Sequence, residues 1–206
     1  PPGTLLAFCR HYTRGLEPYL FSMSLLTALI AIAEVSMFGF LGQLVDWLVH
    51  KQPDSLLADE GGRLLVMTLL MLVGLPLLVL VHSMLLHQTL LGNYPMVIRW
   101  QAHRYLLRQS VSFYSNDFAG RVATKVMQTA LAVREAVMKT LDVLVYVLVY
   151  FISMVVMVGQ ADWRLMLPML IWLVIYMAIQ YYFVPKLKKV AAEQAEARSL
   201  MTGRIV

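Results

Sequence analysis

The sequence predicts an all-α membrane protein with four spanning helices, and three observations support this fold class. Hydrophobic residues make up 60% of the 206 residues and charged residues only 14%, with a mean hydropathy of +0.69. This balance excludes an ordinary soluble domain. Four segments, at about 18–48, 63–92, 138–159 and 163–185, are long and apolar enough to cross a bilayer. Helical periodicity continues beyond the spans, which predicts long helices that extend into water.

Residues 4–17 precede the first span and mix apolar with basic side chains. This pattern is typical of a short elbow helix lying in the membrane interface, although a frayed terminus is an alternative. The first span follows, with Trp47 near its end, a residue suited to the bilayer boundary. Residues 50–62 are expected to form an outer turn, because they contain Pro53, Gly61 and Gly62.

The second span begins near Arg63 and has no clear stop. Gly74 and Pro76 are expected to bend it, because proline removes an intrahelical hydrogen bond. Helical spacing resumes after Pro95 and runs through a loop at 93–137, interrupted only by a polar turn at 115–120. The loop is therefore predicted to be two helices that project from the membrane and meet at this turn.

The third and fourth spans are joined by the short segment 159–164, which predicts a tight outer hairpin. Residues 165–185 contain no charged side chain and would be about 31 Å long as a helix, which matches the hydrocarbon core. A basic, alanine-rich helix is predicted over 186–206. The chain starts without an initiator Met and stops within a helical pattern, so we expect more protein downstream.

Lys and Arg are distributed unevenly over the loops. Two precede the first span, seven lie in the second loop and five follow the fourth span, against two in the first loop and one in the third. Because basic residues concentrate on the cytoplasmic side, both ends and the second loop are predicted to be cytoplasmic. The net charge of +5 therefore reports topology and requires no nucleic-acid partner. Cys9 is the only cysteine, which excludes an intrachain disulfide and a thiolate metal cluster.

Three segments resemble the transmembrane domain of type I ABC exporters. Phe113-Tyr-Ser-Asn-Asp-Phe-Ala-Gly-Arg-Val resembles the family's first coupling helix, a polar turn that lies against a nucleotide-binding domain. Asp162-Trp-Arg-Leu-Met-Leu-Pro resembles the turn between the third and fourth spans, and Pro185-Lys-Leu-Lys-Lys resembles the start of the helix that descends to the second coupling helix. The resemblance covers essentially the whole chain.

This resemblance implies the first four spans of a six-helix bundle in a half-transporter of the bacterial inner membrane. A nucleotide-binding domain, downstream on the same chain or on a partner, and a homodimer or heterodimer are then expected. ATP and Mg²⁺ are expected for the full protein but not in this segment, which lacks the Gly-x-x-x-x-Gly-Lys-Ser/Thr phosphate loop. The residues implied to couple to the nucleotide-binding domain are Asn116, Asp117, Phe118 and Gly120, with Gly120 allowing the chain to reverse. A plain helix-turn-helix is the alternative.

Polar side chains inside the spans are the candidates for a substrate pathway, since lipid cannot satisfy them. Glu34 is the only carboxylate deep in a span, and it could bind a cationic substrate, relay a proton or pack against a hydrogen-bond partner. Asp142, Tyr146 and Tyr150 share one helical face, as do Tyr176 and Gln180 with Trp172. Interhelical hydrogen bonding and interfacial anchoring explain both stripes equally well. His82 and His87 lie about 140° apart on a helix, so a structural or pore-lining role is favoured over a metal site.

The leading hypothesis is therefore the membrane-spanning part of an ATP-driven exporter that moves an amphipathic, lipidic or peptide-like substrate out of the cytoplasm by alternating access. An ion-coupled secondary transporter that uses Glu34, or a four-span membrane scaffold or enzyme, is the alternative. No catalytic residue is assigned, because titratable side chains do not cluster at one depth.

Overall fold

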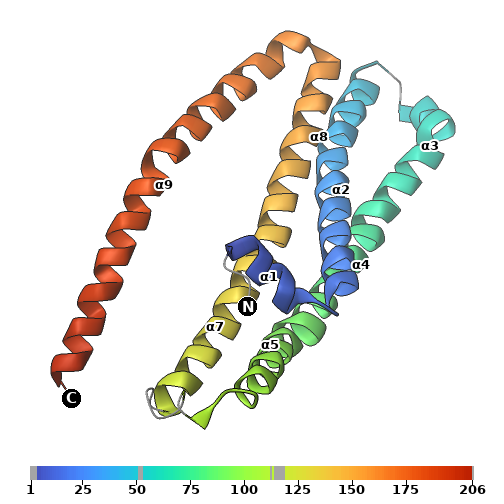
Figure 1. Ribbon diagram of the computed structural model, residues 1–206. Coiled ribbons are helices and arrows are strands. Elements are labelled where there is room, and N and C mark those ends of the chain that lie inside the picture. The colour runs from blue at the N-terminus through green and yellow to red at the C-terminus, as the bar shows by residue number, and fades with distance from the viewer. Residues whose placement is uncertain (1–3, 51–52, 112, 114–118, 206) are drawn as a thin grey trace. The chain divides into compact units, whose positions relative to one another are not determined.

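The computed structural model describes residues 4–50, 53–111, 113 and 119–205, and every regular element in these ranges is helical, as predicted. In chain order the helices are α1 (Leu5–Thr13), α2 (Glu17–His50), α3 (Pro53–Leu69), η1 (Leu70–Gly74), α4 (Leu75–Met84), η2 (Leu85–Leu90), α5 (Leu91–Leu106), α7 (Ala119–Lys139), η3 (Thr140–Leu144), α8 (Val145–Ala161) and α9 (Trp163–Ile205) (Figure 1). The three η elements are short stretches of π-helix. The chain forms two compact units, residues 1–153 and 154–206.

Among the described residues, four helical stretches are long and apolar enough to cross a membrane. They are Glu17–His50, Ala58–Leu106, Val122–Ala161 and Trp163–Ala191. The predicted number of spans is confirmed, and the chain is an integral multi-pass membrane protein. Two stretches, of 49 and 40 residues, far exceed the ~20 residues that a bilayer requires.

The start of the chain forms an elbow in which α1 is shorter than the expected 4–17. The helix ends at Thr13, and Gly15 adopts a φ of 92°, a left-handed conformation that glycine accepts without a Cβ penalty. The Gly15 N–H also lies 3.3 Å from a carboxylate oxygen of Glu17. The chain therefore reverses between α1 and α2 at Gly15.

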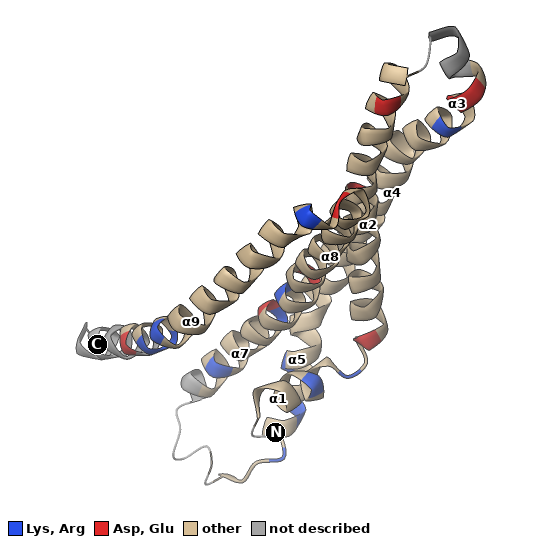
Figure 2. Ribbon diagram, turned by 90° about the horizontal axis from the view of Figure 1, so that it is seen from above, with Lys and Arg blue, Asp and Glu red and all other residues tan. Residues whose placement is uncertain are grey.

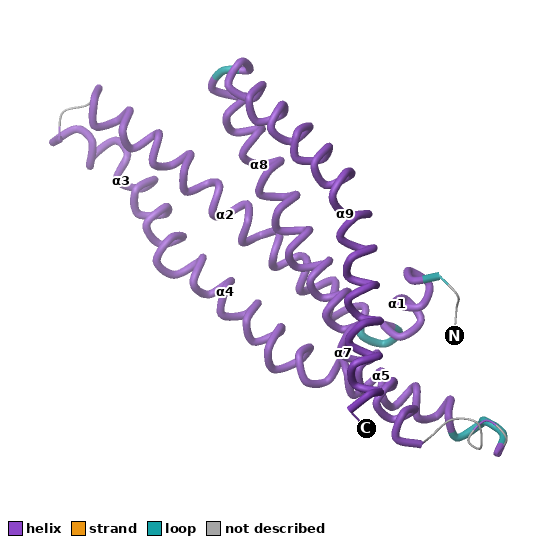
Figure 3. The backbone as a smooth tube through the Cα atoms, turned by 90° about the vertical axis from the view of Figure 1, so that its left-hand side faces the viewer, coloured by secondary structure: helices purple, strands orange, loops and turns teal. Residues whose placement is uncertain are grey.

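From Pro53 to Leu106 the backbone is helical throughout, through α3, η1, α4, η2 and α5 (Figure 3). The outer turn expected at 50–62 is thus shorter than predicted, because α3 already begins at Pro53. Proline is favoured at the first position of a helix, where its missing N–H costs no hydrogen bond. The bend expected at Gly74 and Pro76 coincides with η1, where the Leu75 N–H reaches back five residues to the Leu70 carbonyl. The wider turn accommodates Pro76 without ending the helix.

The core of the first unit lies where α1, the start of α2, α5 and α7 meet. Met23, Leu90, Tyr94 and Ala130 are fully buried there. Thr13 on α1 places its Oγ1 2.8 Å from the Tyr94 hydroxyl on α5, which satisfies both groups at the edge of this core. The core therefore fastens the elbow to the two helices that flank residues 107–118.

Helices α5 and α7 are also joined by a hydrogen bond that a proline makes necessary. Pro95 lies inside α5 and has no N–H to donate to the carbonyl of Leu91, four residues earlier. Nη1 of Arg134, on α7, lies 3.3 Å from this carbonyl oxygen and donates to it. The neighbouring helix thus supplies a donor in place of the N–H that proline lacks.

The second unit consists of the end of α8, a one-residue connection at Asp162, and α9. The carboxylate of Asp162 accepts a hydrogen bond of 2.9 Å from the backbone N–H of Arg164 and so caps the start of α9. A Cβ on Gly159 would lie 3.1 Å from Sδ of Met166, so the two helices approach closely beside the connection. The tight hairpin predicted at 159–164 is confirmed, and α9 continues as one helix through Pro168 and Pro185 to Ile205.

Candidate functional site

Three helices of the first unit meet at a polar cluster of Thr27 on α2, His82 on α4 and Asp142 on η3. Oγ1 of Thr27 lies 2.7 Å from Oδ1 of Asp142 and 3.0 Å from Nε2 of His82. The Nε2 and Oδ1 atoms are 3.2 Å apart. Thr27 is only 3% exposed, while the side chains of His82 and Asp142 are 15% and 28% exposed. The three side chains therefore form a closed triangle of hydrogen bonds in the spanning part of the protein.

The geometry of this cluster determines which groups donate. The hydroxyl of Thr27 has one proton, which it donates to the carboxylate of Asp142. The Thr27 oxygen and the carboxylate are then both acceptors toward Nε2 of His82. Nε2 must therefore carry a hydrogen, in either the neutral or the charged imidazole. A donor imidazole and an acceptor carboxylate are thus placed side by side between three helices.

The π-helical turn η3 contains Asp142 and shapes this cluster. Ser24 on α2 places its Oγ 3.5 Å from the carbonyl oxygen of Leu141, a contact at the outer limit of a hydrogen bond. Thr27 lies one turn further along the same face of α2, against Asp142. Single-turn π-helices are frequent at functional sites because they change which side chains face a neighbouring helix.

A second polar contact lies two helical turns from Thr27, at Glu34 on α2. The hydroxyl of Tyr146 on α8 donates to Oε2 of Glu34 across 2.5 Å. The ring of Tyr146 is stacked on that of Tyr150, with centroids 5.7 Å apart and an interplanar angle of 27°. The structure thus joins Glu34 on α2 to Tyr146 and Tyr150 on α8, a stripe that the sequence had singled out separately from Glu34.

In the second unit, the other predicted stripe is also assembled on α9. The rings of Trp172 and Tyr176 are stacked at 5.4 Å with an interplanar angle of 13°. Nε2 of Gln180 donates to the Tyr176 hydroxyl across 2.8 Å. These residues form a continuous surface of aromatic rings and polar tips along about two turns of one helix.

The predicted coupling residues are largely beyond what the structure describes. Asn116, Asp117 and Phe118 lie outside the described residues. Gly120 is helical, because α7 already begins at Ala119. The expectation that Gly120 reverses the chain is therefore wrong, and residues 119–120 belong to a helix instead of the predicted turn at 115–120. The coupling role of these residues stays a prediction.

Sequence reasoning missed two partners that the structure supplies. Thr27 looks like one more small residue in an apolar span, yet it lies seven residues before Glu34 and therefore on the same helical face. Arg134 looks like part of a solvated basic face, and only its contact with the Leu91 carbonyl in the folded protein reveals its role. Among the described residues, no group of three His, Cys, Asp or Glu side chains could hold a metal ion.

A family model for the ABC transporter transmembrane region matches residues 20–206. The chain belongs to this family. A Haemophilus influenzae protein described as an uncharacterized ABC transporter ATP-binding protein is 44% identical over 206 residues, which is all of this chain and 33% of that protein. The chain therefore spans about a third of the relative's length. No solved structure matches it.

Membership of the ABC transporter family accounts for the fold reported above. Apart from the first three residues of Glu17–His50, the match includes all four spanning stretches and both helices that flank the 107–118 segment. It begins at Leu20, so the elbow helix α1 lies outside the matched residues although it packs into the same core. The resemblance to type I ABC exporters that the sequence indicated is thus confirmed at the level of the family.

Proposed function

We propose that this chain is the membrane-spanning part of an ATP-driven exporter that moves an amphipathic, lipidic or peptide-like molecule out of the cytoplasm by alternating access. The observation that carries the proposal is the length of the second and third apolar helices. A helix of 49 residues is about 73 Å long, against about 30 Å of hydrocarbon core. The excess projects into water as α5, and the start of the 40-residue stretch projects similarly as α7.

The proposed topology places these projecting helices in the cytoplasm. Arg10 lies on α1, two arginines lie on α5 and four Lys or Arg residues lie on α7, and Figure 2 draws Lys and Arg in blue. The positive-inside rule assigns such surfaces to the cytoplasm. The location in a bacterial inner membrane, with both ends of the segment cytoplasmic, rests on this charge pattern and on family membership.

The proposed partner of the cytoplasmic tip is a nucleotide-binding domain, on the same polypeptide or on a second subunit. ATP and Mg²⁺ would bind there, because this segment lacks the phosphate loop. Asn116, Asp117, Phe118 and Gly120 are the proposed contacts. The link between Arg134 and the Leu91 carbonyl joins α5 to α7 above that tip, so a displacement of the tip would move both helices together. The transporter would work as a homodimer or heterodimer of half-transporters.

The proposed substrate pathway runs along the polar side chains within the spans. In the first unit these are Glu34, Asp142, Tyr146 and Tyr150, and in the second unit Tyr176 and Gln180. Carboxylates and aromatic rings inside a membrane suit a molecule that has both an apolar body and polar or cationic groups. The family membership supports ATP-driven transport over an ion-coupled carrier, and Glu34 is then proposed to contact substrate.

The test is a comparison of ATP hydrolysis and conformational change in the full-length protein reconstituted in lipid. Spin labels on α2 and α8 would report the distance change that accompanies ATP binding. Asp117→Ala and Phe118→Ala are expected to leave ATP hydrolysis measurable while reducing the ATP-dependent distance change severalfold. Gln128→Ala, an exposed position on α7, is the matched control and should behave like the wild type. If both variants keep hydrolysis and distance change coupled, the assignment of the joint is wrong.

A further inference from the structure

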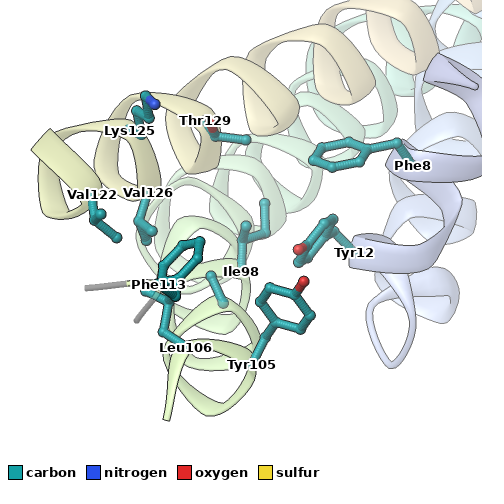
Figure 4. A pocket seen from close by; sticks show the side chains of 11 residues that line it. Phe8, Tyr12, Ile98, Tyr105, Leu106, Phe113, Val122, Lys125, Val126 and Thr129 are labelled. Atoms are coloured by element: carbon teal, nitrogen blue, oxygen red, sulfur yellow. The ribbon is translucent and has the colours of Figure 1, made fainter. Parts of the chain in front are cut away.

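A cavity of about 400 Å³ lies between the elbow helix α1 and the two projecting helices α5 and α7. Figure 4 shows Phe8 and Tyr12 entering it from α1 and Ile98 and Tyr105 from α5, while Lys125 lines its edge from α7 with its amino group turned outward. Its lining is mainly apolar, and its volume falls within the range of small-molecule pockets. A cavity of this size has room for part of an amphipathic molecule, such as one acyl chain.

The helices that surround the cavity are strongly basic. Helices α1, α5 and the first four turns of α7 contain no Asp or Glu. The same stretches and the two residues that follow each of α1 and α5 carry only cations among their charged side chains: Arg10, Arg14, Arg99, Arg104, Arg108, Arg121 and Lys125. One of these cations, Lys125, lines the cavity itself. The charge around the cavity is therefore complementary to an anion.

The position of the cavity relative to the bilayer follows from α1. Leu5 and Leu6 are 77% and 86% exposed on this helix, whereas Phe8 and Tyr12 turn toward the protein. An amphipathic helix of this kind lies in the interface with its exposed leucines in the lipid. The cavity beneath it is then at the level of the lipid headgroups.

Two phenol groups complete the polar side of the cavity. The hydroxyls of Tyr12 and Tyr105 point toward one another in Figure 4. Burial raises the pKa of the Tyr12 phenol, and the neighbouring Tyr105 raises it further. The Tyr12 phenol therefore stays protonated and remains able to donate a hydrogen bond to a phosphate oxygen.

We propose that this cavity binds an anionic phospholipid of the cytoplasmic leaflet, with one acyl chain in the apolar part and the phosphate beside Tyr12 and Lys125. The inference rests on the topology given in the proposed function, because anionic lipids and basic protein surfaces meet on the cytoplasmic side. The bound lipid fills the space between the elbow and the projecting helices, and thereby holds α1 against α5 and α7.

The test measures lipid bound to the purified full-length protein by native mass spectrometry, without nucleotide, using phosphatidylglycerol and phosphatidylcholine of the same chain length. We expect the wild type to retain phosphatidylglycerol at least tenfold more strongly. Ala102→Phe fills the cavity and should abolish this retention, whereas Ala123→Phe, an exposed position on α7, should not. Lys125→Gln should weaken the preference for the anionic lipid about fivefold.

Three results would overturn the proposal. Equal retention of both lipids contradicts the role of charge, and unchanged retention in Ala102→Phe contradicts the location. Competition by glycerol phosphate as effective as by the lipid itself would show an anion site without a chain pocket. If Ala102→Phe does not fold, Lys125→Gln and Tyr12→Phe decide the outcome. ATP hydrolysis by the same samples is measured separately. A loss of lipid binding with normal ATP hydrolysis would refute the lipid site alone, and a lack of ATP hydrolysis with normal lipid binding would count against the transport assignment alone.

Discussion

The hydrogen bond between Arg134 and the carbonyl of Leu91 should make a measurable contribution to the free energy of unfolding, and the size of this contribution should depend on Pro95. Arg134→Met removes the donor, and with proline at position 95 the carbonyl also lacks its usual intrahelical donor four residues later. In Pro95→Ala the new N–H at position 95 is able to donate to the same carbonyl. Arg134→Met should therefore lower the free energy of unfolding much less in the Pro95→Ala protein than in the wild type.

The magnitude follows from the geometry of the bond. Hydrogen bonds with a charged partner contribute about 1.5–3 kcal/mol to stability. The distance of 3.3 Å is at the long end of the range, the Arg134 side chain is still 18% exposed, and its Nη2 also contacts Glu135. We therefore expect Arg134→Met to cost about 1 kcal/mol in the wild type and close to nothing in Pro95→Ala.

A double-mutant cycle provides the assay, because it cancels the effects of Pro95→Ala on helix propensity and packing. The free energy of unfolding is measured for the four proteins in mixed micelles of increasing SDS content, by circular dichroism. Lys139→Met, another exposed cation on α7, serves as the control and should cost the same in both backgrounds. An equal cost of Arg134→Met in both backgrounds would refute the reasoning.

Three further predictions concern the spanning helices. Thr27→Val keeps the shape of the side chain but removes the shared hydroxyl of the polar cluster, so the free energy of unfolding should fall by about 1–3 kcal/mol, and Thr27→Ser should recover most of it. Tyr146→Phe should lower the free energy of unfolding by a similar ~1–3 kcal/mol, because the Glu34 carboxylate loses its donor. In a Glu34→Gln background the same substitution should lower it much less. Equal losses in the two backgrounds would argue against the pairing. Gly42→Ala should raise the free energy of unfolding by about 0.5–1 kcal/mol, because the added methyl group meets open space. Gly159→Ala should raise it less, because the added methyl group meets the sulfur of Met166 at 3.1 Å. A larger gain at position 159 in the same SDS titration would contradict the close packing of the hairpin.

Much of the helical framework could be predicted from local features of the sequence. The spans are visible as uncharged runs, and the hairpin at Asp162 as a short interruption between two of them. The boundaries were less predictable. The segment from Pro53 onward is polar and contains two glycines, which suggested a turn, but it folds as the first part of α3. Proline does not disfavour the helix at its first position, because the N–H that proline lacks would have no partner within the helix there.

The candidate site was predictable only in part. Glu34, Asp142 and Tyr146 stand out because ionisable and hydroxyl groups are costly in lipid. Their pairing was not predictable: Tyr146 contacts Glu34, whereas Asp142 contacts Thr27 and His82. These contacts join residues 60 to 115 positions apart, and their identity depends on how the helices are rotated about their axes. The π-helical turn at Asp142 changes this rotation, and nothing in the local sequence announces it.

The sequence by itself determined that this protein is a bundle of four membrane-spanning helices with long basic extensions. Composition, hydrophobic run length and the distribution of Lys and Arg are sufficient for this, because the bilayer imposes a length and a charge asymmetry on any chain that crosses it. Only the tertiary structure decided which polar groups satisfy one another. In α5 the partner of the Leu91 carbonyl comes from Arg134, 43 residues away, because Pro95 removes the local donor and only a packed neighbouring helix replaces it.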